Sequence, residues 1–592
     1  MYRFILFATF FLAGCGSSVS LVDQGLENQI MHVGNGSEPQ GLDPHIVTGV
    51  PEHHLLITMC EGLTISNPEG GENLPGMAES WEVSDDGKTY IFNIRKNAKW
   101  SNGDDFTAHD MVWSWKRILT ASLGSQYPDM LYYIEGAEEY HTGKVTKKQI
   151  DEIRSRGYGF DITELRTLKN KKRSSLTTNE IERIRRLEEI KKDVDKGIED
   201  DIKNPSWDYV GVKALDDKTL KVTLKNPTPF FIGLLSHYST WPVHKETVLE
   251  YGDIDDRRGL WTRPGSFVCN GAMNLKSWEL NKKIVVEKNP LYWDAESVKL
   301  NEIHFYPVSD VNTEDRMFSA GQLHLTSTVP SEMCPLWIEQ GNPNLRIDPY
   351  MGTYFYRTNT TIEPLNDVRV RKALALAIDR NHITKNVNKC GAIPAYSFTP
   401  PGSNGYFPDT KIGTDLELAK SLLAEAGYPN GEGFPELEIL FNTSEGHRQI
   451  ALAIQQMWKK NLGINVILDN MDWKVYLSRE MIGDFQISRA GWIGDYEDPN
   501  TFLDTLRPNR GNNKTGWDNK EFDSLVKLAN ETTNQEKRYE LLREAERILI
   551  DEMPIIPIYT YVRAYQLSPD VKGFYPNYLD HHHPKTIYLE RE

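Results

Sequence analysis

The segment LPGMAESWEVSDDGKTYIFNIRKNAKWSNGDDFTAHDMVWSWKRIL (residues 74–119) contains an alternating pattern of apolar and polar residues at 88–95. The same alternation recurs at 218–225 (KTLKVTLK). Successive side chains of a β-strand point to opposite faces, so both stretches are predicted to be strands with one buried face. The apolar residues of these two faces are Tyr90, Phe92, Ile94, Leu220, Val222 and Leu224.

Amphipathic helices alternate with strands in the second half of the chain. Apolar residues three or four apart predict helices at 367–380, 415–426, 447–462 and 535–552. Asp367 and Asp415 are predicted N-caps, and Gly427 is a predicted C-terminal cap. The last two helices are followed by the strand-like runs INVIL and PIIPIYTYV. This alternation predicts an α/β fold rather than an all-β fold or a helical bundle.

Length and composition limit the class of protein. The chain has 592 residues, which favours two or three domains. With 39% hydrophobic and 26% charged residues, it is neither a disordered chain, a collagen-like repeat nor a coiled coil. The net charge of −17 argues against nucleic acid or an anionic membrane surface as the main partner.

The N-terminus has the features of an export signal. Residues 1–15 (MYRFILFATFFLAGC) combine Arg3, a short apolar run and small residues before Cys15. The end of this run resembles the bacterial lipobox, which implies lipidation of Cys15. We therefore expect a signal peptide at 1–14, a lipidated cysteine with a tether at 15–28, and attachment to a membrane by lipid alone. The alternative is an ordinary cleaved signal with an incidental cysteine.

Neither the other cysteines nor the histidine clusters indicate a metal site. Cys60, Cys269, Cys334 and Cys390 are scattered without a CxxC motif, so their pairing stays open and buried free thiols are the favoured interpretation. The run 581–583 (HHH) and the pair 53–54 (HH) are interpreted as solvated loops. We expect no metal and no cofactor.

Residues 144–206 differ from the rest of the chain. They hold 17 Lys and Arg and 13 Asp and Glu but few aromatic residues. Residues 178–202 carry apolar residues three or four apart, which predicts a charged helix with a thin apolar stripe. We interpret the block as a helical insertion that packs weakly on the body and is dispensable for ligand binding. Its acidic and basic residues interleave, which argues against nucleic-acid binding.

The chain carries no nucleophile elbow, P-loop, HExxH or dinucleotide-binding motif. It does carry an acidic cluster, Asp495, Glu497 and Asp498, directly after the turn-like sequence GWIG at 491–494. Paired carboxylates can perform acid–base chemistry, can hold an ammonium group, or can simply be solvated. A carboxylate beside glycine and tryptophan suits a small site for a cationic group.

Several long segments together resemble the bacterial extracellular solute-binding proteins of family 5, and most closely their oligopeptide-binding branch, which serves peptide ABC importers. The resemblance covers nearly the whole chain after the signal, except block 144–206. Besides 74–119, it rests on Leu42-Asp43-Pro44 and on the segments at 210–231, 270–278, 285–294, 365–380, 394–401, 442–466 and 489–503.

The resemblance implies a periplasmic-binding-protein fold of the class II, cluster C-like type. Two main lobes are joined by a two-crossover hinge near residues 350 and 561, and a third lobe is added. Lobe I would comprise about 29–60, 244–350 and 562–592. Lobe II would comprise about 61–243 with the insertion, and lobe III about 351–561. A peptide would lie between lobes I and III as an added β-strand.

Site residues are implied by position in the matching segments. Asp495 matches the aspartate that pairs with the peptide α-ammonium. Gly491, Trp492 and Ile493 match the strand that pairs with the peptide backbone, and Val50 matches the partner segment on lobe I. The remaining matched positions, which line the cleft, are Tyr127, Trp473 and Arg489.

The chain departs from the family pattern at several cleft positions. Glu480, with Arg479 adjacent, replaces an arginine, and Asn388 replaces a lysine. Thr48 stands where a glutamate is usual. Gly352 and Ile493 occupy two positions that are disulfide-linked cysteines in close relatives. These changes leave the preferred peptide length and side chains open.

The function implied is a monomeric, lipid-anchored receptor without catalytic activity, located in the periplasm or at the cell surface. It would bind oligopeptides and deliver them to the membrane subunits of an ABC importer. The alternative keeps the fold and changes the solute to a dipeptide, a murein peptide, a metal chelate or a sugar. A hydrolase using the carboxylates at 495–498 is the third hypothesis, which the missing nucleophile and metal motifs disfavour.

Overall fold

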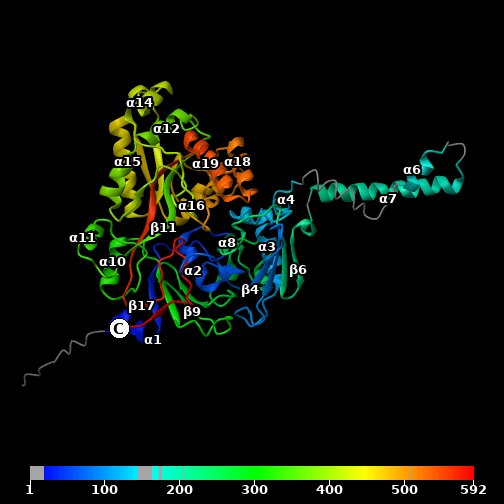
Figure 1. The fold of residues 1–592 in the computed structure, drawn as a ribbon, viewed down its shortest axis with the longest axis horizontal. Coiled ribbons are helices and arrows are strands. Elements are labelled where there is room, and N and C mark those ends of the chain that lie inside the picture. Colours follow the sequence, from blue (N-terminus) through cyan, green and yellow to red (C-terminus); the bar gives the residue numbers. More distant parts are fainter. Residues whose placement is uncertain (1–18, 145–162, 172–175, 204–205, 509, 592) are drawn as a thin grey trace, which may run out of the picture.

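The computed structural model describes residues 19–144, 163–171, 176–203, 206–508 and 510–591. Three larger sheets flanked by helices make up most of the body, and one pair of helices projects from it (Figure 1). Two further sheets of the described chain have two strands each, and one of them pairs β17 (Val571–Lys572) with β18 (Tyr588–Leu589). The predicted signal peptide, at 1–14, and Cys15 lie outside the described residues. None of the helices in the described part of the chain combines the length and hydropathy needed to cross a bilayer.

The first sheet, called here the N-terminal sheet, combines strands that are far apart in sequence. Its order is β1-β10-β9-β8, with β1 parallel to β10 and the other pairs antiparallel. Its strands are β1 (Ile30–Gly34), β8 (Met273–Glu279), β9 (Lys283–Lys288) and β10 (Glu302–Tyr306). The helices of these segments are α1 (Leu21–Asn28), α2 (Val50–Met59), α9 (Lys245–Tyr251), α10 (Val311–Ser319) and α11 (Cys334–Glu339).

The second sheet, the side sheet, contains the two strands predicted from alternation. Its antiparallel order is β4-β5-β7-β6, formed by β4 (Ala78–Val83), β5 (Thr89–Ile94), β7 (Thr219–Thr223) and β6 (Val212–Asp216). The predicted faces of β5 and β7 are buried, with Phe92, Leu220 and Val222 fully enclosed. The adjoining elements are α3 (Ala108–Ile118), η2 (Pro128–Leu131), α4 (Ala137–Thr142), α8 (Phe231–Leu234), η6 (Tyr238–Thr240) and the short pair β2 (Thr64–Ile65) and β3 (Leu74–Pro75).

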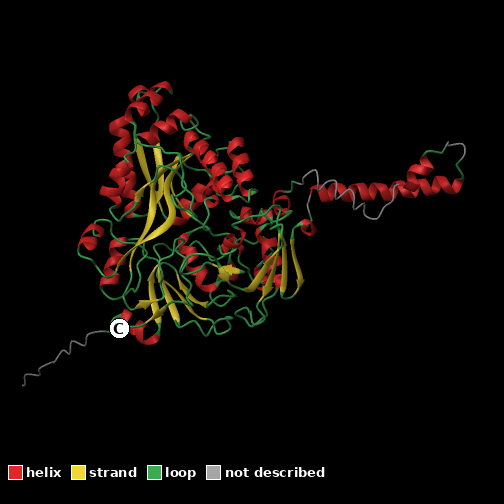
Figure 2. Ribbon diagram, in the orientation of Figure 1, coloured by secondary structure: helices red, strands yellow, loops and turns green. Residues whose placement is uncertain are grey.

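The third sheet, the central sheet, forms the upper body in Figure 2. Its order is β12-β16-β11-β15-β13-β14. The strands are β11 (Leu345–Thr358), β12 (Ile393–Pro394), β13 (Leu437–Asn442), β14 (Val466–Met471), β15 (Ile487–Ile493) and β16 (Ile555–Gln566). The helices are α12 (Val368–Leu376), α13 (Arg380–His382), η8 (Ile383–Asn388), α14 (Leu416–Glu425), α15 (Glu445–Leu462), α16 (Trp473–Ile482), α17 (Asn500–Leu503), α18 (Lys520–Asn530) and α19 (Gln535–Glu552).

Two helices of the central sheet, α12 and α14, begin at the predicted N-caps. The side chain of Asp367 accepts a hydrogen bond at the start of α12, and that of Asp415 does so at the start of α14. The predicted helix at 367–380 ends early, because α12 stops at Leu376 and a separate turn, α13, follows. The α/β prediction is confirmed by the alternation of these helices with the six strands.

Two long antiparallel strands connect the upper and lower parts of the body. β11 and β16 pair from Leu345 with Gln566 to Arg357 with Ile555, and the register shifts between Pro349 and Thr353. The lower end of β16 continues into contacts with the N-terminal sheet, because Leu567 forms a bridge with Leu325 and Leu325 forms another with Val33. The pair therefore provides the two crossings that the hinge prediction requires (Figure 1).

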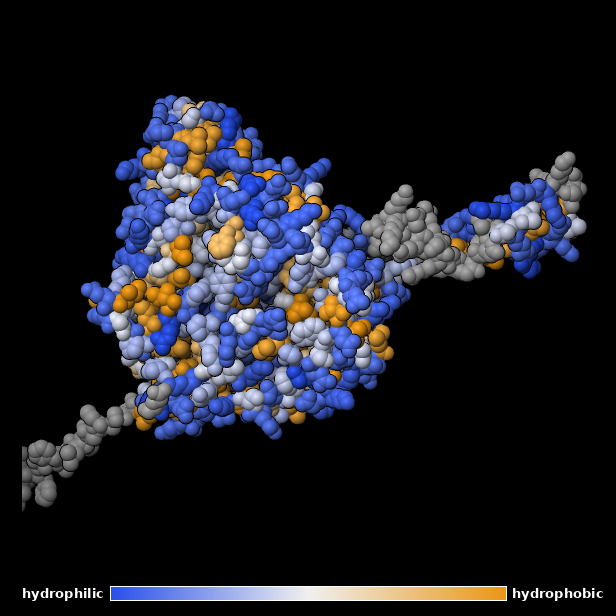
Figure 3. Space-filling view, viewed as in Figure 1, coloured by the Kyte–Doolittle hydropathy of each residue, from blue (hydrophilic) through white to orange (hydrophobic). Residues whose placement is uncertain are grey.

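The described part of block 144–206 is helical. It contains α6 (Thr163–Lys169) and α7 (Thr178–Lys203), which project from the body in Figure 1. The two helices pack on each other through the buried side chains of Leu165 and Leu187. Their surface is mostly hydrophilic (Figure 3), and salt bridges such as Arg183 with Glu164 connect them. The helix prediction for 178–202 is confirmed.

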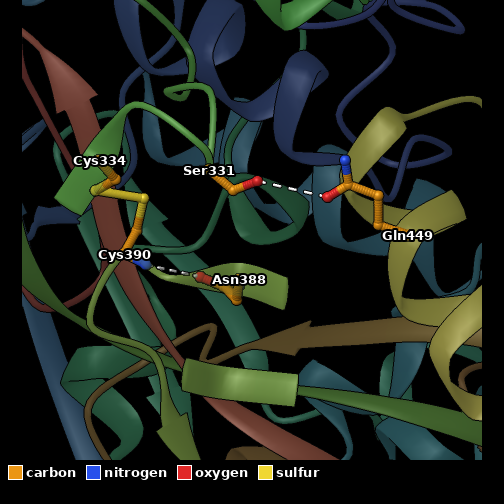
Figure 4. The surroundings of a disulfide bond; sticks show 5 residues. All are labelled: Ser331, Cys334, Asn388, Cys390 and Gln449. Atoms are coloured by element: carbon orange, nitrogen blue, oxygen red, sulfur yellow. Dashed lines mark hydrogen bonds between the residues drawn. A yellow bond between two sulfur atoms is a disulfide. The ribbon is translucent and has the colours of Figure 1, made fainter. Parts of the chain in front are cut away.

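The cysteines correct one sequence-based expectation. Cys60 and Cys269 are buried free thiols, as expected, but Cys334 and Cys390 form a disulfide (Figure 4). The bond connects α11 to the segment that follows η8, and the two cysteines are 56 positions apart in sequence. The sequence could not reveal this pair because the two residues approach each other only when α11 packs beside β16.

The structure also corrects the expectation that the two histidine clusters lie in solvated loops. His581 and His583 are buried rather than solvated, and His53 is buried on α2. The ring centroids of His53 and His581 lie 4.7 Å apart, and Ser66 Oγ lies 2.5 Å from His581 Nδ1. Among the described residues, no group of three or more potential ligand side chains is arranged to hold a metal ion.

Candidate functional site

A chain of three cavities lies between the N-terminal and central sheets. Their volumes are about 130, 300 and 400 Å³, and they are called here the first, second and third cavity. The first and second cavities share Gly49, Trp473 and Gly491, and the second and third share Tyr350 and Tyr561 among others. Shared walls make the three a single elongated cleft, which suits an extended ligand.

All eight binding residues predicted from the resemblance line the first cavity. They come from α2, from the segment before η2, from α16, and from β15 and the turn that follows it. These residues are Val50, Tyr127, Trp473, Arg489, Gly491, Trp492, Ile493 and Asp495. The folding of the chain therefore brings together positions that are up to 445 residues apart in sequence.

Strand β15 offers a free backbone edge to this cleft. One edge of β15 pairs with β11 along its whole length, from Ile487 to Ile493. The other edge pairs with β13 only at Ile487 and Ser488, so 489–493 have no strand on that side within the described chain. An unpaired edge displays alternating donors and acceptors that an extended peptide can satisfy without regard to its sequence.

Asp495 is a buried carboxylate without a fixed cation. Its side chain is 10% exposed, and among the described residues no Lys or Arg nitrogen lies within 4.0 Å of it. Its neighbours are His237 Nε2, at 3.2 Å from Oδ1, and the Thr501 hydroxyl, at 3.4 Å from Oδ2. Burial, together with the charge of Asp129, raises the pKa of Asp495 well above its usual value.

His237 acts as a neutral donor in this arrangement. Burial, with a smaller contribution from His53, lowers its pKa well below the usual range, so it supplies no positive charge to Asp495. Its Nδ1 accepts from the backbone N–H of Ser239 at 3.4 Å. The hydrogen therefore resides on Nε2, which points at the carboxylate. A cationic ligand group would therefore supply the positive charge that His237 does not provide to Asp495.

The structure separates the three acids that the sequence grouped together. Asp498 forms a bidentate ion pair with Arg538, with nitrogen–oxygen distances of 2.6 and 2.8 Å, and both side chains are 3% exposed. Glu497 lies at the surface and lines none of the three cavities. Asp495 alone faces the cleft, so the cluster does not provide two carboxylates for acid–base chemistry.

Aromatic rings surround the carboxylate. The ring centroid of Tyr127 lies 4.9 Å from that of His237 and 6.4 Å from that of Trp492. The ring of Tyr238 packs against that of His237, with centroids 4.1 Å apart and planes tilted by 39°. These rings exclude water from Asp495, and their faces also attract an ammonium group.

Arg489 is the second charged group of the cleft without an ionic partner. Its guanidinium donates to the Asn442 side chain at 3.3 Å and to the Tyr561 hydroxyl at 2.9 Å. It also lies 5.0 Å above the ring of Tyr354. No carboxylate lies within 4.0 Å of it in the described chain, and it lines all three cavities. A ligand carboxylate could therefore pair with it.

At two of the positions where the chain departs from the family pattern, neighbouring residues neutralise the changed charge or fill the changed space. Glu480 pairs with Arg357 at 2.7 Å and accepts from the Ser488 hydroxyl at 2.6 Å, so its charge is neutralised inside the protein. Gly352 and Ile493 are direct partners in the β11–β15 register. A Cβ at Gly352 would lie 2.4 Å from Ile493 Cδ1, so the isoleucine fills the space beside a glycine.

The family model for bacterial extracellular solute-binding proteins, family 5 Middle, matches residues 73–514. The chain belongs to this family. It is a solute-binding protein and not an enzyme. The periplasmic oligopeptide-binding protein OppA of Salmonella typhimurium is 35% identical, and the match covers 98% of this chain and 97% of that protein. The oligopeptide-binding protein OppA of Bacillus subtilis is 36% identical, over 91% and 88% respectively.

Solved structures agree in fold and indicate the conformational state. Haemophilus influenzae OppA in complex with the peptide RPPGFSPFR has a TM-score of 0.81 and 31% identity, covering 95% of this chain and 99% of that one. The unliganded open form of the murein tripeptide binding protein MppA has the same identity but a TM-score of 0.59, at 96% and 98% coverage. The predicted fold class is confirmed, and this chain resembles the peptide complex more than the open form.

Several cleft residues were not found from the sequence. His237, Arg357 and Lys514 line the first cavity beside the predicted residues. His237 lies in a loop-like stretch, LSHYST, and Lys514 lies in GNNKTG, and neither context has a pattern that indicates a site. Only the packing of η6 and of the loop before α18 against β15 brings them to the cavity.

Proposed function

We propose that this chain is a lipid-anchored extracytoplasmic receptor that encloses oligopeptides between lobes I and III and delivers them to an ABC importer. The boundaries of the lobes are those proposed above, with β11 and β16 as the hinge. Closure of the lobes would bury the ligand and present one composite face to the importer. Anchoring through Cys15 and a monomeric state are parts of the same proposal.

The observation that carries the proposal is Asp495. A buried carboxylate without a protein cation destabilises the ligand-free fold, and a peptide α-ammonium would supply the missing charge. The free edge of β15 begins beside this anchor and runs into the second cavity. The combination fixes one end of a peptide by charge and the following residues by backbone hydrogen bonds.

Peptide selectivity for a free N-terminus tests the proposal. In calorimetry with tri- to pentapeptides, Asp495→Ala should weaken binding more than about a hundredfold, because breaking a buried pair costs about 3–5 kcal/mol. N-acetylation of the peptide should produce a comparable loss in the native protein. Glu497→Ala is the matched control, since this neighbouring acid lies outside the cleft.

Two results would contradict the proposal. The first is unchanged affinity of Asp495→Ala for an unmodified peptide. The second is a ligand other than an oligopeptide, identified by mass spectrometry on protein purified without denaturation, which would favour a dipeptide, murein peptide, chelate or sugar receptor. Mass analysis of the membrane-bound protein tests the anchor, because lipidation at Cys15 adds acyl chains to that residue.

A further inference from the structure

Lys514 is a second cation at the Asp495 end of the cleft. Its side chain is partly buried and lines the first cavity, which also contains Asp495. It lines neither the second nor the third cavity. By contrast, Arg489 lines all three, so both cations face the first cavity and only Arg489 extends to the other two.

Lys514 has no ionic partner in the part of the chain that the structure describes. No Asp or Glu oxygen lies within 4.0 Å of its ammonium group among the described residues, and the acid with the strongest influence on it is Glu480. That carboxylate is already paired with Arg357 and receives the Ser488 hydroxyl. The two charges of the Arg357–Glu480 pair cancel, and Lys514 therefore adds a net positive charge to the cavity.

The environment of Lys514 disfavours an isolated charge. Burial lowers its pKa to about 8, and the attraction of Glu480 offsets burial only in part. The amine is still mainly protonated at neutral pH. A partly desolvated ammonium without a partner gains more from a carboxylate than an exposed one does, because less water has to be displaced when the pair forms.

We propose that Lys514 is a specificity-determining residue that selects peptides with an acidic side chain among their first residues. This inference rests on the proposed function, because the position is counted from the α-ammonium held by Asp495. The two groups line the same cavity of about 130 Å³, so a carboxylate that reaches Lys514 belongs to a residue close to that ammonium.

The first experiment compares peptides that differ in one charge. Calorimetry measures the affinity of the native protein for Ala-Glu-Ala and Ala-Gln-Ala, and then for peptides with the Glu or Gln at the first or third position. At one position at least, the Glu peptide should bind about tenfold more tightly, which is the gain expected for one charge-assisted contact. Equal affinities at all three positions would overturn the inference.

The second experiment assigns the preference to Lys514. Lys514→Met should remove the Glu-over-Gln preference, measured as the ratio of the two affinities within the same variant. Lys514→Arg, which keeps the charge, should retain the preference. Lys460→Met, on the exposed surface of α15, is the control for a general change of charge. A preference that persists in Lys514→Met would overturn the inference.

The outcomes distinguish this inference from the proposed function. If the native protein binds neither peptide at any position, the proposed function fails. If it binds Glu and Gln peptides equally, peptide binding stands and the role of Lys514 fails. The native comparison requires no variant, so a folding defect in Lys514→Met cannot obscure it, and Lys514→Arg provides a second folded reference.

Discussion

The two ends of the cleft are built from different chemistry. The first cavity contains Asp495, Lys514 and Arg489, three charged groups without an ionic partner in the described chain. The third cavity, about three times larger, is lined by apolar and uncharged polar residues, and a disulfide closes its wall. Arg489 lines this cavity too, and its other charged residues, Glu314, Glu445 and Arg563, each have a partner inside the protein. The uncharged polar residues include Ser331, Asn388 and Gln449 (Figure 4), together with Ser444.

This difference shows how one receptor can combine affinity with tolerance. Unpaired buried charges gain strongly from a complementary ligand group and discriminate against its absence. Neutral polar walls can be bridged by water and accept many side chains at little cost. The first cavity would therefore determine affinity, and the third would accommodate whatever follows along the peptide.

The largest effect is expected from Asp495→Asn. Because the folded-state pKa of Asp495 is raised, its carboxylate destabilises the ligand-free protein progressively as pH rises above the unfolded-state value. Removing the charge should raise the melting temperature of the ligand-free protein at pH 7. It should also lower the affinity for peptide by about a hundredfold or more. Thermal unfolding with and without peptide measures both. A lower melting temperature without ligand would contradict this account of the site.

Removing the disulfide should affect stability more than binding. The double substitution Cys334→Ser with Cys390→Ser should lower the unfolding free energy by about 2–4 kcal/mol, because the cross-link restricts the unfolded chain. Peptide affinity should stay within about fivefold, since the bond lies beside the third cavity, which neither Asp495 nor Lys514 lines. Denaturant unfolding and calorimetry are the measurements. Reductant should destabilise the native protein but not the variant, and a large loss of affinity would show that this end also anchors ligand.

Peptide binding should depend on pH through Asp495. A ligand ammonium binds the carboxylate form, so affinity should rise with pH up to the raised pKa of the free protein, by at most about tenfold per pH unit, and then level off. Below that pKa, binding should release a proton, which calorimetry in buffers of different ionisation enthalpy detects. Proton release that persists in Asp495→Asn would assign it to another group.

The smallest effect is expected at the far end of the cleft. Gln449 accepts a hydrogen bond from the Ser331 hydroxyl at 3.5 Å (Figure 4), and both residues line the third cavity. Gln449→Ala should change tripeptide affinity by less than about threefold, the equivalent of one ordinary hydrogen bond at most. Titration of peptides of increasing length would reveal whether the effect grows once a ligand reaches this cavity.

The sequence was informative about features that depend on local residue patterns. Alternation located β5 and β7, and the capping aspartates located the starts of α12 and α14. The family segments also identified eight residues that line one cavity. The early end of α12 was missed, because the amphipathic pattern continues through a turn that only the surrounding packing imposes.

The sequence alone therefore determined the α/β class and the family, and it singled out Asp495 as the candidate anchor, because periodicity and long matching segments can be recognised without a structure. Tertiary structure alone decided which acid of the cluster faces the cleft, since Arg538 reaches Asp498 from 40 residues away. It also decided the pairing of Cys334 with Cys390, the burial of His581 and the position of Lys514. In each of these cases, the environment of a residue depends on a segment that is distant in sequence. Sequence spacing does not show which distant segments come into contact in the folded protein.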